Sequence, residues 1–158
     1  MNHPKIVNIE TIIHQSQMQG YRLAFTNGCF DMFHSGHAHL LKSIKEDLPW
    51  GGKLIVGVNG DKSVRGNKGP DRPILSQEQR AFMVACQESV DHVFIFDDLT
   101  VERYLKHLKP SRWYKGGDYS VGSLNPVEKA SCGQTEVRFI PFAEEISATK
   151  IIEKIKKL

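Results

Sequence analysis

Apolar positions in this chain form two alternating patterns. Short, nearly continuous apolar runs are typical of strands buried on both faces, and they occur at about residues 22–26, 53–58, 93–96, 113–114 and 136–142. Apolar residues at helical spacing fill the other segments, at about residues 8–20, 36–48, 76–88, 98–108, 125–131 and 147–157. This alternation over the whole length predicts an α/β fold: a Rossmann-like, doubly wound parallel sheet of five strands with helices on both faces.

Polar residues near the ends of these elements refine the pattern. Asn8 can cap the first helix and Gly20 can end it. Ser76 and Gln79 have the spacing of a capping box. The segment 59–75 is mostly polar, so we expect a loop there, and a loop of that length in a compact domain is usually functional.

Composition narrows the class of protein. Of 158 residues, 40% are hydrophobic and 25% are charged, and the formal net charge of +3 is too mild to indicate a nucleic-acid or anionic-membrane partner. Three widely spaced cysteines favour a reducing, cytoplasmic location over a disulfide framework. We see no signal peptide, membrane span or interdomain linker. We therefore expect one domain over residues 1–158, with an N-terminal helix in 1–20 and a core in 21–158.

Glycines and polar residues follow three of the predicted strands. They are Gly28, the run Asn59-Gly60-Asp61 and the run Gly116-Gly117-Asp118. In open parallel sheets, ligands bind beyond the carboxyl ends of the strands, at the point where the strand order reverses. We therefore expect a ligand site where these clusters meet.

The segment 26–37 joins an apolar strand to a glycine turn and the start of a helix, which is the usual form of an anion pocket. His34 and His37 follow the turn. They can hydrogen-bond a phosphate or, as imidazolium, neutralise its charge. The alternative is that the two histidines lie at the surface, or have their hydrogen bonds satisfied within the protein, and have no functional role. Metal binding with His39 is disfavoured, because His37 and His39 would point roughly 200° apart on a helix.

Other polar residues have similar alternatives. Lys68 and Arg72 can clamp phosphates or be ordinary solvated charges. Asp118 can bind a sugar hydroxyl or a metal, or belong to a plain turn. Ser147 and Thr149 lie at the start of the last helix, where hydroxyls and N–H groups can hold a phosphate. Ser147 is in any case suited to be its N-cap.

Two motifs carry a resemblance to a known family. Gly28-Cys29-Phe30-Asp31-x-x-His34-x-Gly36-His37 resembles the G-x-F-D-x-x-H-x-G-H motif of the cytidylyltransferase-like nucleotidyltransferases, and Ile146-Ser-Ala-Thr-Lys-Ile151 resembles their C-terminal I-S-x-T-x-I motif. They lie at opposite ends of one α/β domain. The resemblance covers the chain from about Arg22 and implies a nucleotidyltransferase type of Rossmann-like fold.

Shorter motifs are similar to those of the bacterial adenylyltransferases that act on D-glycero-β-D-manno-heptose 1-phosphate and make ADP-heptose for lipopolysaccharide. These are Lys68-Gly69-x-x-Arg72-Pro73, Glu78-Gln79-Arg80 and Lys115-Gly116-Gly117-Asp118-Tyr119. Such enzymes are often fused behind a sugar kinase, and we expect the stand-alone form here. Ala148 replaces a Ser or Thr that is common in the C-terminal motif, and residues 120–125 follow no pattern of the family.

The resemblance implies transfer of a nucleoside monophosphate from a nucleoside triphosphate, ATP, to a sugar 1-phosphate, with release of pyrophosphate. Mg²⁺ is expected with the ATP. No protein nucleophile is needed, and Asp31 would hold the geometry of its motif. The implied catalytic residues are His34, His37, Lys68 and Arg72. The implied nucleotide-binding residues are Asn27, Gly28, Cys29, Phe30, His34, His37, Lys115, Gly116, Asp118, Ser147 and Thr149.

Two other functions stay open on the sequence. One is a CTP-dependent cytidylyltransferase acting on glycerol 3-phosphate or another alcohol phosphate. The other is a nucleotide-binding module without catalysis. The partners implied are small-molecule substrates, with no nucleic acid and no membrane. Members of the family often form homodimers or larger homo-oligomers, and we expect the same of this chain.

Overall fold

A computed structural model describes residues 2–49, 51–117, 121–141 and 146–158. Its strands are β1 (Leu23–Gly28), β2 (Lys53–Asn59), β3 (His92–Phe96), β4 (Arg112–Gly116) and β5 (Glu136–Ile140). Its helices are α1 (Ile9–Gln19), α2 (Ser35–Asp47), α3 (Asp61–Lys68), α4 (Gln77–Ala85), α5 (Glu102–Leu108), α6 (Pro126–Ala130) and α7 (Ala148–Ile155), with a short 3-10 turn, η1 (Val121–Ser123). The strands form one five-stranded sheet in the order β3-β2-β1-β4-β5. All neighbouring pairs are parallel, which confirms the predicted fold class.

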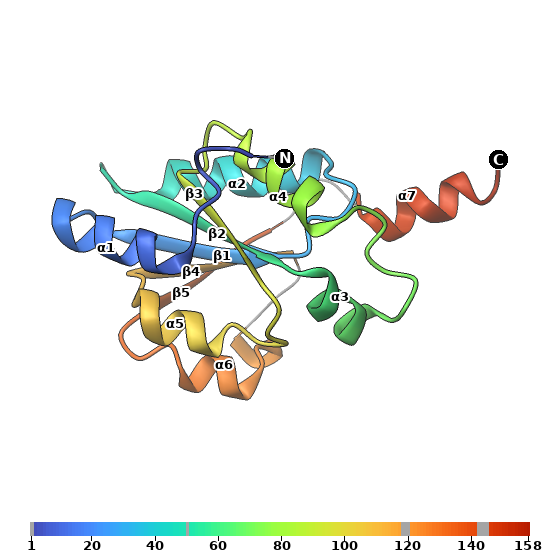
Figure 1. The fold of residues 1–158 in the computed structure, drawn as a ribbon. Coiled ribbons are helices and arrows are strands. Elements are labelled where there is room, and N and C mark those ends of the chain that lie inside the picture. Colours follow the sequence, from blue (N-terminus) through green and yellow to red (C-terminus); the bar gives the residue numbers. More distant parts are fainter. Residues whose placement is uncertain (1, 50, 118–120, 142–145) are drawn as a thin grey trace.

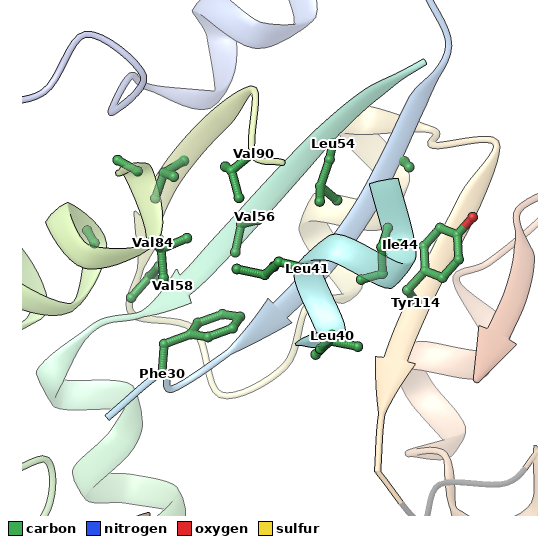
Figure 2. Packing of buried hydrophobic residues seen from close by; sticks show 14 residues of the cluster. Phe30, Leu40, Leu41, Ile44, Leu54, Val56, Val58, Val84, Val90 and Tyr114 are labelled. Carbon is green, nitrogen blue, oxygen red and sulfur yellow. The ribbon is translucent and has the colours of Figure 1, made fainter. Parts of the chain in front are cut away.

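Helices cover both faces of the sheet, as Figure 1 shows: α2 and α4 on one face, and α1, α5 and α6 on the other. Each face has its own apolar cluster. Leu41 and Ile44 of α2 and Val84 of α4 pack over Val56 and Val58 of β2 on the first face (Figure 2). Burial on both faces explains why β1 and β2 have nearly continuous apolar sequences.

The N-terminal helix belongs to the second apolar cluster. Asn8 caps α1 through a hydrogen bond from the Thr11 amide, and Gly20 ends it with a φ of 66°, as predicted. Ile12 is fully buried beside α5 and the sheet. Helix α1 is therefore packed against the rest of the fold through apolar contacts. Within the ranges described, no helix is long and apolar enough to cross a bilayer.

Strand order reverses beside β1. The chain passes from β1 through α2 to β2 on one side, and it later returns to place β4 on the other side. The carboxyl ends of β1 and β4 therefore flank the switch point, where ligands bind in folds of this kind. Figure 1 shows α3 and α7 at this same end of the sheet.

The prediction of a loop over residues 59–75 was wrong in its first half, because Asp61–Lys68 is helix α3. Contacts from distant segments stabilise this short polar helix. The Asp61 amide donates to Gln77 Oε1 at 2.9 Å, and the buried Ser63 hydroxyl donates to the Asp98 carbonyl at 2.9 Å. Neither partner is near in sequence, so apolar periodicity gave no sign of the helix.

Smaller differences concern the ends of elements. The capping box of Ser76 and Gln79 is present, but α4 ends at Ala85 instead of residue 88. Helix α5 begins at Glu102 instead of residue 98 or 100. Strand β1 runs two residues further than expected, to Gly28, which brings Asn27 into the sheet.

Candidate active site

The turn after β1 has a strained backbone at the centre of the predicted anion pocket. Phe30 and Met32 adopt φ angles of 52° and 47°, which are rare for such side chains. The Phe30 ring is buried in the first apolar cluster (Figure 2), and burial of this ring stabilises the turn. A Cβ atom on Gly28 would lie 3.2 Å from the Phe30 ring. Gly28 and Phe30 therefore shape the turn together.

His34 and His37 lie side by side at the start of α2. Their rings stack with a centroid distance of 3.8 Å and an interplanar angle of 20°. The His34 amide donates to His37 Nδ1 at 3.4 Å. Because Nδ1 accepts this bond, the neutral His37 ring carries its proton on Nε2. His37 can therefore donate a hydrogen bond to a ligand through Nε2–H.

Both histidines are neutral at pH 7 in the free protein. Burial, followed by the charges of His34 and Lys68, lowers the pKa of His37 to about 4, against a smaller opposing effect of Asp31. Burial also lowers the pKa of His34. Two protonated rings stacked this closely would repel each other. The geometry thus favours the hydrogen-bonding role of the pair over the imidazolium role. His39 is exposed and faces Ser43 at 3.4 Å, away from the pair.

Gly36 joins the two sequence motifs in space. A Cβ atom at this position would lie 3.1 Å from the His34 ring and 3.2 Å from Ile146 Cγ2. Gly36 thus leaves room for the His34 ring on one side and for the C-terminal motif on the other. Gly36 of the first motif and Ile146 of the C-terminal motif therefore lie side by side.

Asp31 and Arg72 make a second link between the motifs. Asp31 is 3% exposed and accepts the amides of Ile74 and Leu75 at 2.9 and 3.0 Å, so it holds the geometry, as expected. Arg72 pairs with Asp31 at 3.4 Å and donates to Thr149 Oγ1 at 3.3 Å. Arg72 therefore lies between the histidine motif and the start of α7.

Lys68 is the last residue of α3, and its side chain is exposed. Its charge lowers the pKa of both Cys29 and His37. Burial outweighs this effect at Cys29 and raises the pKa of the thiol. A thiol of raised pKa is a poor nucleophile at neutral pH.

The start of α7 lies on the other side of Arg72 from the histidine motif. Ser147 is the N-cap of α7, and its hydroxyl accepts the Lys150 amide at 3.2 Å. The Thr149 hydroxyl meets Arg72. The N–H groups and dipole of the helix start thus lie beside the Arg72 side chain, an arrangement that favours anions. Their contact with a phosphate stays a prediction.

The ends of β1 and β4 form the side predicted to face the nucleotide. Lys115 Nζ donates to Asn27 Oδ1 at 3.4 Å and lies 4.4 Å from the centroid of the Trp113 ring. Gly116 ends β4. Asp118, the remaining nucleotide residue of the prediction, lies outside the described residues. The structure thus brings Asn27 and Lys115 together at the switch point.

Sequence reasoning assigned no role to Arg80, which is fully buried. Its guanidinium donates to the carbonyls of Cys29, Asn59 and Leu75 at 2.6, 2.7 and 3.0 Å and to Asp61 Oδ1 at 2.8 Å. It therefore ties together three loops that surround the pocket. A sign was available in the sequence, since Arg80 lies four residues before the buried Val84 on the apolar face of α4.

No cluster of three or more His, Cys, Asp or Glu side chains able to hold a metal ion occurs within the described parts of the chain. The Asp31 carboxylate is already used by two amides and Arg72.

Comparison with known proteins places this site in a family. The cytidylyltransferase-like family model matches residues 25–154, which include both motifs. The chain belongs to the cytidylyltransferase-like family. A crystal structure of the lipopolysaccharide core biosynthesis protein from Thermoplasma volcanium superimposes with a TM-score of 0.61 over 79% of this chain and 98% of the other, at 22% identity. That likeness supports the fold.

Curated relatives are more similar in sequence. The chain is 42% identical over 145 residues to the bifunctional protein HldE of Alcanivorax borkumensis, covering 92% of the chain and 30% of that protein. It is 41% identical to HldE of Helicobacter pylori strain G27, covering 98% of the chain and 32% of that protein. HldE of Nitratiruptor sp. is 43% identical, covering 94% and 30%. The chain spans about a third of the length of these relatives.

Proposed function

We propose that this chain transfers the adenylyl group of ATP to a sugar 1-phosphate, with D-glycero-β-D-manno-heptose 1-phosphate as the preferred acceptor. A phosphate oxygen of the acceptor attacks the α-phosphorus of ATP in line. The bond from the α-phosphorus to the bridging oxygen of the β-phosphate breaks, and pyrophosphate leaves with that electron pair. The products are ADP-sugar and pyrophosphate, and no covalent enzyme intermediate forms.

One observation carries the proposal: the stacked histidines and the start of α7 lie at one site, joined through Gly36 against Ile146 and through Arg72 against Thr149. A triphosphate laid across this site would have its α-phosphate at the histidines and its β- and γ-phosphates at Ser147 and Thr149. Positioning and charge stabilisation supply most of the catalysis in phosphoryl transfer of this kind.

His37 Nε2–H would donate to a non-bridging oxygen of the α-phosphate, where negative charge develops in the transition state. His34 would support the same phosphate from the neighbouring position. Lys68 and Arg72 would neutralise phosphate charge. The backbone of Gly28, Cys29 and Phe30 would line the pocket.

On the nucleotide side, Asn27, Lys115, Gly116 and Asp118 would border the bound ATP. Mg²⁺ would enter with the ATP and supply charge neutralisation of the triphosphate and the leaving pyrophosphate. Chelation with EDTA should then abolish turnover, and MgCl₂ should restore it. Because ATP and sugar phosphates are intracellular metabolites, the proposed location is the cytoplasm.

Support for the acceptor comes from motifs and relatives. The strings around Lys68, Arg80 and Lys115 are similar to those of the heptose 1-phosphate adenylyltransferases, and the curated relatives named HldE are 41–43% identical to this chain.

A pyrophosphate-release panel tests the proposal. ATP and CTP are each combined with heptose 1-phosphate, glycerol 3-phosphate and other sugar 1-phosphates. We expect release with ATP and the heptose, and ADP-heptose by mass spectrometry. Release only with CTP would replace the adenylyltransferase by the cytidylyltransferase alternative. Tight ATP binding without release from any acceptor would favour the non-catalytic module.

A matched pair of histidine variants tests the mechanism. Asn at position 37 keeps an acceptor for the His34 amide but lacks the Nε2–H donor. We expect His37→Asn to lower kcat by about 10²–10³, as for loss of one oxyanion donor, while folding normally. His39→Asn removes an exposed imidazole two residues away and should leave kcat unchanged. Near-normal turnover of a folded His37→Asn protein would remove His37 from the reaction.

A further inference from the structure

A buried ion pair lies behind the proposed nucleotide side of the site. Lys115 Nζ and Glu128 Oε2 are 3.6 Å apart, and each side chain is only 11% exposed. Lys115 comes from β4 and Glu128 from α6. Burial lowers the pKa of Lys115, and the Glu128 carboxylate opposes this effect. The carboxylate thus keeps a buried amine charged.

Glu128 also connects this lysine to a second element. Its other carboxylate oxygen, Oε1, accepts the Val101 amide at 3.1 Å, immediately before α5. The carboxylate is therefore fixed from two sides, by a backbone N–H and by the ammonium. A side chain held in this way has little rotational freedom, so the position of the Lys115 ammonium is fixed as well.

Asn27 and Trp113, both residues of the sheet, also contact Lys115. Asn27 Oδ1 accepts both Lys115 Nζ at 3.4 Å and the Trp113 indole N–H at 3.2 Å, and the lysine lies over the fully buried Trp113 ring. Both residues belong to the neighbouring strands of the switch point. The ammonium is thus placed at the carboxyl ends of β1 and β4.

A buried ion pair is weak evidence for stability, because desolvation of the two charges offsets most of their attraction. An ammonium at a ligand-binding edge, in contrast, gains from being held charged and in one place. The location of the pair therefore indicates a role in the site.

We propose that Glu128 is a positioning residue of the nucleotide site, which holds the Lys115 ammonium charged and in place beside Asn27 for contact with bound ATP. The inference rests on the proposed function, since it takes ATP as the ligand. Glu128 itself touches neither substrate. Its effect reaches the nucleotide through Lys115.

Glu128→Gln tests this role, because Gln keeps the acceptor for the Val101 amide and removes only the charge. We expect the KM for ATP and the Kd of ATP by calorimetry to rise about tenfold, with kcat changed less than threefold. Glu136→Gln is the matched control. Glu136 is an exposed carboxylate paired with Arg112 and Arg138 at the opposite end of the sheet, and its loss should leave both constants unchanged.

A double-mutant cycle separates positioning from a general structural role. Lys115→Met should raise the KM for ATP about as much as Glu128→Gln, and the double variant should be no worse than Lys115→Met alone. Additive effects, or a KM of Glu128→Gln within twofold of wild type, would overturn the inference. If Glu128→Gln folds poorly, Glu128→Asp keeps the charge but withdraws the carboxylate, and it should raise the KM by a smaller factor.

The pH dependence of KM gives an independent readout. Glu128 and the Cys132 thiol are the titratable groups that face Lys115 in the described residues. Without the Glu128 carboxylate the pKa of Lys115 falls, so Lys115 loses its charge at a lower pH. As the pH is raised, ATP binding should therefore weaken earlier in Glu128→Gln than in wild type. Identical profiles would contradict the inference.

These outcomes are distinct from those of the proposed function. A wild-type protein that binds no ATP would overturn both proposals. A wild-type protein that makes ADP-sugar, with Glu128→Gln unaffected in KM and Kd, would overturn only the positioning role.

Discussion

Replacing the fully buried Arg80 of α4 by Met should destabilise the loops around the site. Met fills the space of the aliphatic part of the Arg side chain but has no hydrogen-bond donor. The substitution removes donors to the carbonyls of Cys29, Asn59 and Leu75 and to the Asp61 carboxylate. All four acceptors would lose their charged partner, and the three carbonyls belong to half-buried residues.

The magnitude follows from these four bonds. A hydrogen bond to a charged group contributes about 1.5–3 kcal/mol, and breaking a buried ion pair by removing one partner costs about 3–5 kcal/mol. Asp61 is 27% exposed and can regain water, and desolvation of Arg80 itself is no longer needed. We therefore expect a loss of about 3–5 kcal/mol in the free energy of unfolding, or roughly 10 °C in Tm at ~2–4 °C per kcal/mol. Arg80→Lys keeps the charge but cannot reach four acceptors, and it should lose about half as much.

Urea unfolding followed by tryptophan fluorescence measures this loss, since Trp113 is fully buried in the folded protein. Arg103→Met removes an exposed arginine of α5 and should change stability by less than about 0.5 kcal/mol. In the folded fraction of Arg80→Met we expect kcat/KM for ATP to fall as well, because the three loops lose their common tie. A loss below about 1 kcal/mol would refute the reasoning, since it would mean that the carbonyls find other donors at no cost.

Two further predictions concern the histidine motif. The pKa of His37 in the folded protein is about 4, below its ordinary value of 6.5, so the stabilisation due to neutral His37 is fully present above pH 6.5 and is lost as the pH falls toward 4. Between these pH values the free energy of unfolding of wild type should fall by about 2–3 kcal/mol more than that of His37→Asn. An equal pH dependence of the free energy of unfolding in the two proteins would contradict this prediction. Gly36→Ala places a methyl group against the His34 ring and Ile146, and we expect kcat to fall at least about tenfold with a modest loss of Tm. Gly66→Ala in α3, whose methyl group would meet only the end of the exposed Leu99 side chain, is the control and should keep wild-type kcat.

Sequence patterns predicted most of the fold because the signals were local. Apolar runs identified all five strands, and caps such as Asn8 and Ser76 marked helix starts within a few residues. Helix α3 was missed because its supports are not local: they come from Gln77, Asp98 and Arg80. A helix with few apolar residues forms when tertiary contacts satisfy its polar groups, and periodicity does not report them.

The candidate site divides in the same way. Motif spacing was enough to single out His34, His37 and the C-terminal hydroxyls. It did not give the tautomer of His37, since that depends on the fold of the turn. Nor did it give the roles of Arg80 and Glu128, whose partners lie up to 51 residues away in the sequence.

The sequence alone determined the class of fold, the positions of its five strands along the chain and the two motifs predicted to bind phosphate, because these follow from local periodicity and short-range spacing. Only the tertiary structure decided how the site is held. It stacked two neutral histidines, set Gly36 against Ile146, and used Arg80 and Glu128 to fix groups on separate loops. The physical reason is that the role of a buried charge depends on the groups it contacts, and tertiary packing brings these groups together from distant parts of the sequence.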